Sequence, residues 1–290
     1  MTLYKYVHQD RVDVLRTNLI RYTPPALLND PFESTLGFGE QISLDNMLDH
    51  CGGDLLGHVR ARILKDARAL MIPDVERKLD KIIEENGAEL LGNLATHLPH
   101  YNREINTVLA AGFSTFLSNI GVLSLASRPD NLLMWAHYSN QHKGFVIALN
   151  EGHSTFNERR GPSDEFRYLR KVEYSRTKPA IQLKDAKIED ILFHKSDDWS
   201  YEDEWRIVKA LSDARTVVDL GKEQIHLFDL LPDAIEGVFF GAHMSAPDRE
   251  QLVDIIRGKP ELAHVSIQAA KLQADVYSLR FEEVSTVSPY

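Results

Sequence analysis

The pattern of apolar residues changes twice along this chain, from strand-like to helix-like and back. Between residues 43 and about 119, apolar residues such as Leu55, Val59 and Ile63 recur every three or four positions, the spacing of a helix with one buried face. Before and after this stretch, short apolar runs bounded by glycine, proline and polar residues predict strands. We therefore predict a sheet assembled from two separated segments, with a helical segment inserted between them.

The order of the expected elements also predicts the fold class. Strands and helices that mix irregularly favour an α+β domain with a mixed or antiparallel sheet over a doubly wound parallel sheet. We predict a discontinuous core domain formed by residues 1–39 and 120–290, and an inserted helical subdomain formed by residues 40–119. The insertion carries few residues suited to chemistry, and in one alternative interpretation of the chain it docks a protein partner.

Composition restricts the classes of partner and site. The chain has 290 residues, 43% of them hydrophobic, which is ordinary for a globular protein, and its net charge of −10 disfavours a chain-wide attraction to nucleic acid or anionic membranes. Cys51 is the single cysteine, which excludes an intramolecular disulfide and a multi-cysteine zinc site. Because there is no run of about 18 apolar residues, we expect no membrane span and a cytoplasmic protein.

Four short motifs combine polar residues with aromatic or apolar ones. They are LYKY at 3–6, NDPFES at 29–34, NLLMWAHYSNQHKGF at 131–145 and KSDDWSYEDEWR at 195–206. If the last motif is a strand from Glu202 onward, Glu202, Glu204 and Arg206 share one face and Trp205 lies on the other. This row is either a structural ion-pair ladder or the floor of a site. Two neighbouring acids repel each other and raise at least one pKa, which favours the site.

Taken in this order, the four motifs resemble a bacterial family catalogued as domain of unknown function 2971. The resemblance runs from residue 3 to about residue 241, with a variable helical stretch between the second and third motifs. The combination of NDPFE, WAHY followed by HKGF, and WSYEDEWR is much more specific than any one of them. The resemblance implies a bacterial accessory protein, of a kind linked in some cases with toxin or anti-phage loci.

A looser similarity links the chain to ADP-ribosyltransferase toxins, through a first strand and helix, an Asn/Pro loop, a helical insertion and a late strand with a glutamate. This similarity implies that NAD or a related nucleotide is the substrate, that nucleic acid or protein is the acceptor, and that Glu204 or Glu202 is the catalytic carboxylate. A carboxylate stabilises the positive charge that develops on ribose when the N-glycosidic bond breaks. The expected cofactor-binding residues are Tyr4, Lys5, Tyr6, Asn29, Asp30, His137, Tyr138, His142 and Arg206. LYKY lacks the His or Arg common on the first strand of such transferases.

Two other functions fit the same motifs. His137 and His142 could hold a metal ion with Asp30 and with Glu33 or Glu204, as in a metal-dependent phosphodiester hydrolase. We favour no metal, because a lone histidine in such a segment is more often structural and the two histidines are not at the i, i+4 spacing of one helix face. Alternatively, the motifs form the pocket of a non-catalytic ligand-sensing or partner-binding module. NDPFE also has a purely structural explanation, in which Asn29 and Asp30 cap backbone amides, Pro31 fixes the turn and Phe32 fills the core. A local basic rim for phosphates would consist of Arg159, Arg160, Arg167, Arg170 and Lys171.

Overall fold

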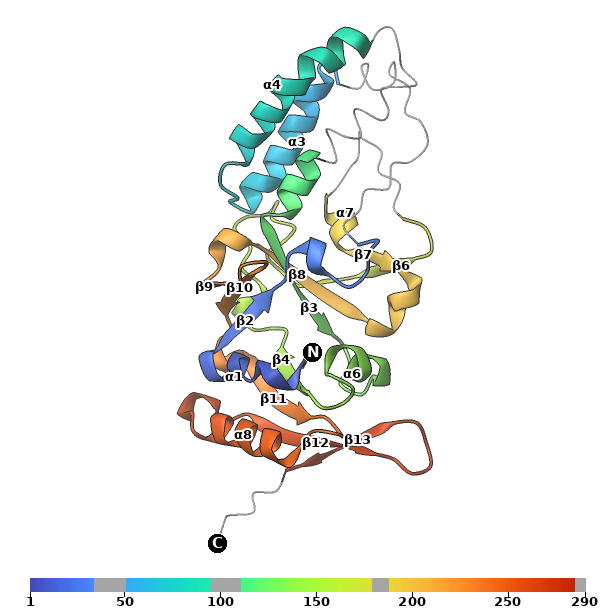
Figure 1. Cartoon of the computed structure of the whole chain (residues 1–290), viewed down its shortest axis with the longest axis vertical. Coiled ribbons are helices and arrows are strands. Elements are labelled where there is room, and N and C mark those ends of the chain that lie inside the picture. Colours follow the sequence, from blue (N-terminus) through green and yellow to red (C-terminus); the bar gives the residue numbers. More distant parts are fainter. Residues whose placement is uncertain (34–50, 95–110, 179–187, 285–290) are drawn as a thin grey trace.

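Eight strands form a mixed sheet through the centre of the molecule (Figure 1). The computed structural model describes residues 1–33, 51–94, 111–178 and 188–284. Within these residues, the strand order across the sheet is β13-β12-β11-β4-β1-β3-β8-β5. The bounds of these strands are β1 Thr2–Val7, β3 Ile120–Ala126, β4 Phe145–Asn150, β5 Arg170–Lys171, β8 Glu204–Ala210, β11 Ile235–Phe240, β12 Ser266–Leu272 and β13 Leu279–Glu283. A three-stranded sheet contains β2 (Leu19–Tyr22), β10 (Gln224–Asp229) and β9 (Thr216–Asp219), and β6 (Glu173–Ser175) pairs with β7 (His194–Ser196).

The large sheet is mixed because one of its pairs is parallel. β11 and β12 run in the same direction, since helix α8 (Ala246–Arg257) carries the chain back between them, whereas the other neighbouring pairs described are antiparallel. The hydroxyl of Ser245 accepts a hydrogen bond from the backbone amide of Asp248 and so begins α8. The predicted α+β class with a mixed or antiparallel sheet is confirmed. An ADP-ribosyltransferase-like arrangement stays a prediction.

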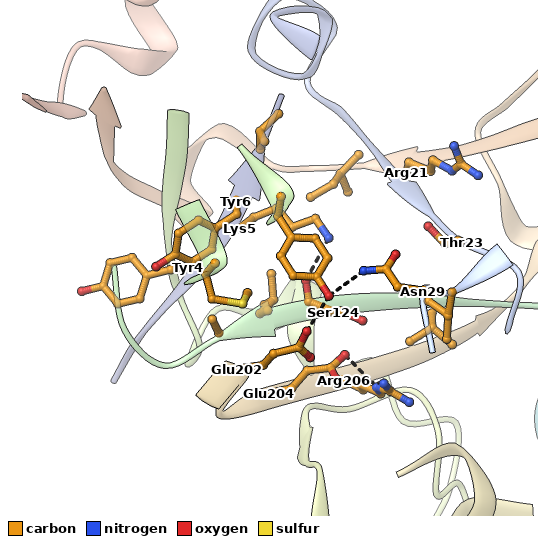
Figure 2. Close-up of a pocket in the computed structure, with 18 of the residues that line it drawn as sticks. Tyr4, Lys5, Tyr6, Arg21, Thr23, Asn29, Ser124, Glu202, Glu204 and Arg206 are labelled. Carbon is orange, nitrogen blue, oxygen red and sulfur yellow. Dashed lines mark hydrogen bonds and ion pairs between the residues drawn. The ribbon is translucent and has the colours of Figure 1, made fainter. Parts of the chain in front are cut away.

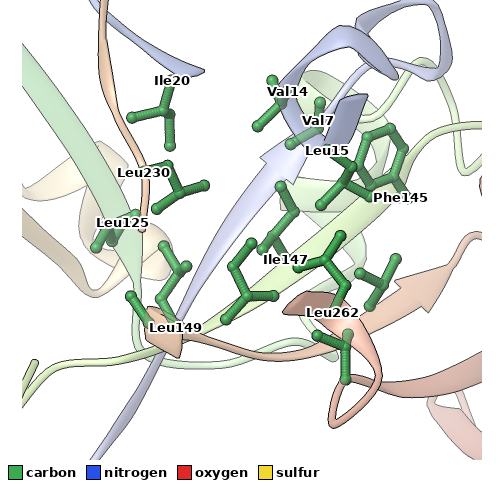
Figure 3. Close-up of a cluster of buried hydrophobic side chains, with 14 of the residues drawn as sticks. Val7, Val14, Leu15, Ile20, Leu125, Phe145, Ile147, Leu149, Leu230 and Leu262 are labelled. Atoms are coloured by element: carbon green, nitrogen blue, oxygen red, sulfur yellow. The ribbon is translucent and has the colours of Figure 1, made fainter. Parts of the chain in front are cut away.

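Strand β4 lies at the centre of the core and is buried on both faces. Phe145, Ile147 and Leu149 face one apolar cluster, which also includes Leu15 of helix α1 (Asp13–Thr17) and side chains of α8 (Figure 3). The alternate residues Val146 and Ala148 join a second cluster that contains Trp135 of helix α6 (Leu132–Tyr138). An almost continuous apolar sequence, FVIAL, is what burial on both faces requires. This packing fixes β1 and α6, which both border the pocket described below.

The helices of the middle segment pack on one end of the sheet. α3 (Leu55–Ala69), α4 (Val75–Leu94) and the helical residues 111–117 fall within the stretch predicted to be helical. Phe113 and Phe116 pack with Val122 of β3 and Val208 of β8 in a shared apolar cluster. The helical segment therefore shares part of its core with the sheet. Its division from the rest of the chain as a separate subdomain stays a prediction.

Candidate functional site

A pocket of about 330 Å³ opens between β1 and β3. Its walls come from β1, β2, β3, α6, the loop before residue 34, β7 and β8. All four sequence motifs contribute to it, through residues that include Lys5, Asn29, Tyr138, Lys195, Glu202, Glu204 and Arg206. The pocket lies at the lower end of the volumes typical of small-molecule sites.

The pocket exists because β1 and β3 pair at only one position. Tyr4 of β1 lies opposite Ala126 of β3. On the same edge of β3, Val122 pairs with Thr23 instead of with a residue of β1. The carbonyl of Ser124, between these two points, accepts a hydrogen bond from Lys5 Nζ at 2.9 Å. A side-chain amine thus satisfies a carbonyl that an ordinary ladder would pair with backbone, and the two strands are free to separate.

The WSYEDEWR motif is a short helix followed by a strand, so the expectation of one strand from Glu202 onward was wrong. A 3₁₀ helix covers Asp197–Glu202, and β8 begins at Glu204. Asp203 lies between them with a left-handed φ of 42°, and its side chain accepts a hydrogen bond from the hydroxyl of Ser127. Because of this turn, the side chains of Glu202 and Glu204 do not follow the regular alternation of one strand. Both still line the same pocket.

Three glutamates and two cations form a buried cluster on the pocket floor. Lys195 Nζ lies 2.6 Å from Glu202, 3.1 Å from Glu33 and 3.5 Å from Glu204. Arg206 donates two hydrogen bonds to Glu204, at 2.7 and 2.8 Å, and another to Glu33. These five side chains are at most 5% exposed. An ion-pair network does exist, but it lines a buried site and is not a surface ladder.

The two glutamates of the motif have opposite pKa shifts. Burial raises the pKa of both carboxyls, but the two-pronged contact with Arg206, helped by Lys195, lowers the pKa of Glu204 to about 2. For Glu202, burial is the largest influence and the neighbouring charge of Glu204 adds to it, so its pKa is raised despite the contact with Lys195. Glu204 is therefore a permanent anion. Glu202 is the better proton acceptor.

A chain of hydrogen bonds joins Glu202 to two other motifs (Figure 2). The hydroxyl of Tyr138 donates to Glu202 Oε1, and the amide of Asn29 donates to the same hydroxyl at 2.7 Å. Burial and the negative charge of Glu202 raise the pKa of Tyr138, so this hydroxyl stays protonated and keeps its role as donor. The chain fixes the orientation of Glu202 toward the pocket.

Of the other residues predicted for the site, some line the pocket and some do not. Tyr4, Lys5 and Tyr6 line the pocket as expected. Asp30 is buried outside the lining, where its carboxylate accepts a hydrogen bond from the amide of Phe32 at 2.8 Å and closes the turn. Phe32 is 66% exposed, so the expectation that it fills the core was wrong.

The two histidines of the third motif do not reach the pocket lining. His137 is exposed, and His142 stacks on Trp135 with ring centres 6.1 Å apart. The structure thus does not bring together the His and Asp donors named for a metal-dependent hydrolase. In the part of the chain that the structure describes, no group of three or more His, Cys, Asp or Glu side chains is arranged to hold a metal ion.

Sequence reasoning missed several residues of the site, among them Ser124 of the pocket lining and Tyr174, which contacts Glu204. Ser124 is a polar residue within the apolar strand GVLSLAS, and that exception was a usable signal. Tyr174, whose hydroxyl accepts a hydrogen bond from the amide of Glu204 at 2.9 Å, gave no signal in the sequence. Glu33 was named from the sequence as an alternative metal ligand, and the structure places it in contact with Arg206 and Lys195.

Each residue of the expected basic rim contacts another residue of the chain. Arg167 is 1% exposed and pairs with Asp164 and Asp213, and Lys171 pairs with Asp203 at 2.8 Å. Arg159, Arg160 and Arg170 contact Tyr168, Asp213 and Glu165. As for membranes, none of the helices that the structure describes combines the length and the apolar character needed to cross a bilayer.

Fold and site together define an α+β protein with three buried glutamates on the floor of a pocket of about 330 Å³. Residues 134–207 match the model of the family described as "Protein of unknown function (DUF2971)". The matched segment contains WAHY, HKGF and WSYEDEWR, so the resemblance found in the sequence is confirmed over these residues. The matched segment also contains five residues that line the pocket, namely Tyr138, Lys195, Glu202, Glu204 and Arg206. No curated protein and no solved structure matches the chain.

Proposed function

We propose that the pocket binds NAD and cleaves the bond between nicotinamide and ribose, passing ADP-ribose to a nucleic-acid or protein acceptor or to water. The observation that carries this proposal is the difference between the two buried carboxylates. Glu204 is held as an anion by Arg206, whereas Glu202 is tethered by Tyr138 and Lys195 and has a raised pKa. Two carboxylates with separated pKa values are suited to different tasks in one reaction.

The reaction assigns each carboxylate a role. When the C1–N bond breaks, its electron pair leaves with nicotinamide and positive charge develops on the ribose ring. Glu202 and Glu204 both stabilise that charge in a site from which most water is excluded. The acceptor then attacks C1, and its proton passes to Glu202, which the raised pKa makes the stronger base. Glu202 is thus the proposed catalytic residue, and Glu204 acts through its fixed charge.

The pocket walls support a ligand of this kind. Tyr4 and Tyr6 offer aromatic surface beside the carboxylates, and Asn29 offers an amide to sugar hydroxyls. The volume of about 330 Å³ suits the nicotinamide and ribose half of NAD and leaves the adenosine half toward the opening. Tyr138 is a positioning residue, because it acts on the substrate only by orienting Glu202.

Nicotinamide release tests the proposal directly. The purified chain is incubated with NAD alone and with DNA, RNA or a bacterial protein extract as acceptor, and free nicotinamide is measured by chromatography. We expect release by the wild type and a loss of at least about 100-fold in Glu202→Gln, the size typical of a missing acid–base group. Glu204→Gln should also lose activity, with a lower melting temperature because Arg206 is left buried without its main partner.

A matched control is Glu84→Gln, since Glu84 is an exposed residue of α4 outside the pocket lining. This variant should release nicotinamide at the wild-type rate. Intact NAD in every acceptor arm would refute the proposal and leave a non-catalytic binding module as the function of the pocket. Equal activity in the folded Glu202→Gln variant and the wild type would refute the role of Glu202.

On the family resemblance alone, we extend the proposal to a bacterial toxin or anti-phage effector. An enzyme that consumes NAD lowers the NAD content of the cell that contains it. Induced expression of the wild type in bacteria should therefore slow growth and deplete NAD, and expression of Glu202→Gln should do neither. Growth inhibition that is equal for both variants would contradict this role.

A further inference from the structure

Two lysines face the pocket, and their surroundings differ sharply. The ammonium of Lys195 is in contact with three carboxylates. Burial lowers the pKa of Lys195, but the charges of these carboxylates outweigh it, so the pKa is raised. Lys5 has no carboxylate within ion-pairing distance (4.0 Å) among the described residues, and its recorded partner is the carbonyl of Ser124. A carbonyl accepts a hydrogen bond from a neutral amine as well as from an ammonium, although the ammonium donates the stronger bond. Unlike Lys195, Lys5 therefore has no ion pair among the described residues that would hold it in the charged form.

The position of Lys5 makes it both enclosed and accessible. It comes from the central strand β1 and faces the same space as Ser124 and Glu202 (Figure 2). Burial is the largest influence on its amine and lowers its pKa to about 8; the charge of Glu204 opposes this shift, and the charges of Arg11 and Arg21 reinforce it. Part of its surface remains exposed to the pocket. A lysine in such a setting is a nucleophile at neutral pH.

We propose that Lys5 is a covalent carbonyl-binding site, at which its Nζ condenses with the aldehyde group of a small polyhydroxylated aldehyde such as an open-chain sugar. The neutral nitrogen attacks the carbonyl carbon, a C–N bond forms, and the carbonyl electron pair moves to oxygen. The nitrogen loses its two protons to that oxygen, which leaves as water, and a C=N bond remains. No oxidant or reductant is required.

The pocket lining selects the class of aldehyde. Asn29, Tyr138 and Glu202 provide donors and acceptors for hydroxyl groups. The other Lys and Arg side chains of the lining already have carboxylate partners, since Lys195 and Arg206 pair with the glutamates of the floor, Arg11 with Asp13 and Arg21 with Glu223, and a ligand carboxylate would have to compete with these partners. The neutral hydroxylated compound is therefore the expected ligand, in preference to a keto acid or an aldehyde acid. With a raised pKa, the carboxyl of Glu202 is also suited to carry a proton between nitrogen and oxygen.

Reductive trapping tests this proposal in the intact chain. The protein is incubated at pH 7 with D-glyceraldehyde and sodium cyanoborohydride, which reduces the C=N bond, and modified lysines are identified by peptide mass spectrometry. At this pH an amine with a pKa of about 8 has roughly 200 times more neutral form than an ordinary lysine. Restricted access reduces this advantage, and we expect Lys5 to be labelled at least about tenfold faster than exposed Lys222.

Several comparisons make the result decisive. Lys195 should stay unlabelled, Lys5→Arg should remove only the fast label, and the matched control Lys222→Arg should keep it. Labelling of Lys5 no faster than Lys222 in the folded wild type would overturn the proposal, whether or not Lys5→Arg folds. Faster trapping of glyoxylate than of glyceraldehyde would overturn the ligand class. The experiment contains no NAD, so its outcome is independent of the proposed NAD cleavage.

Discussion

Replacing Arg206 with methionine removes the cation that the buried carboxylates most depend on. The guanidinium is 1% exposed and donates to Glu204 twice, to Glu33 and to the carbonyl of Leu192, the last residue of helix α7 (Ile188–Leu192). Methionine has a similar length and fills the space without any donor. The substitution therefore separates the electrostatic contribution of Arg206 from its packing.

The size of the effect can be worked out in two ways. Removing one partner of a buried ion pair typically costs about 3–5 kcal/mol of the free energy of unfolding. Independently, lowering the pKa of Glu204 from 4.5 to about 2 corresponds to about 3 kcal/mol. The two figures agree. For a chain of this size, we expect the melting temperature of Arg206→Met to fall by roughly 6–20 °C at pH 7.

The dependence on pH gives the sharper test. Because the pKa of Glu204 is lower in the folded state, its contribution is complete above about pH 4.5 and is lost as the pH falls toward 2. In Arg206→Met this contribution is missing. The difference in the free energy of unfolding between wild type and variant should thus be largest near pH 7 and should shrink toward pH 3.

Urea unfolding followed by circular dichroism at pH 7, 5 and 3 measures this difference. The matched control is Arg128→Met, since Arg128 is 68% exposed and its pair with Asp130 should contribute about 1 kcal/mol or less. A difference that stays constant with pH would mean that packing, and not charge, explains the loss. A loss below about 1 kcal/mol at pH 7 would refute the assigned role of Arg206.

Three further predictions follow from individual residues. Gly144→Ala should cost about 1–3 kcal/mol in urea unfolding because its Cβ would lie 2.1 Å from the carbonyl of Val7, whereas Gly161→Ala, with nothing within 4 Å, should be nearly neutral; equal losses would contradict this. Burial raises the pKa of Asp66 to about 6, so stability falls as the pH rises from about 4 to about 6, where the carboxyl is ionised in the unfolded chain but not in the folded one, and Asp66→Asn should raise the melting temperature at pH 8 but not at pH 4. Tyr138→Phe removes a hydrogen bond that lowers the pKa of Glu202, so nicotinamide release should slow and its acidic midpoint should shift to higher pH; an unchanged pH profile would argue against this positioning role.

Much of the fold could be predicted from local patterns. The alternation in LYKYV, the continuous apolar run FVIAL and the three-to-four spacing of the middle segment each depend on neighbours only a few residues away. These patterns led to β1, β4, α3 and α4. The start of β8 was misjudged because the left-handed turn at Asp203 depends on its contact with Ser127, which is 76 residues away in sequence.

The sequence by itself determined which side chains were available for a site: the acids of WSYEDEWR, Asn29 in its loop, Tyr138 on its helix and Lys5 on the first strand. Only the tertiary structure decided what each of them can do. The pKa of Glu204 was lowered and that of Glu202 was raised, and Lys195 gained carboxylate partners while Lys5 gained a carbonyl. The physical reason is that burial and charge set a pKa, and both depend on groups that folding brings together from distant parts of the chain.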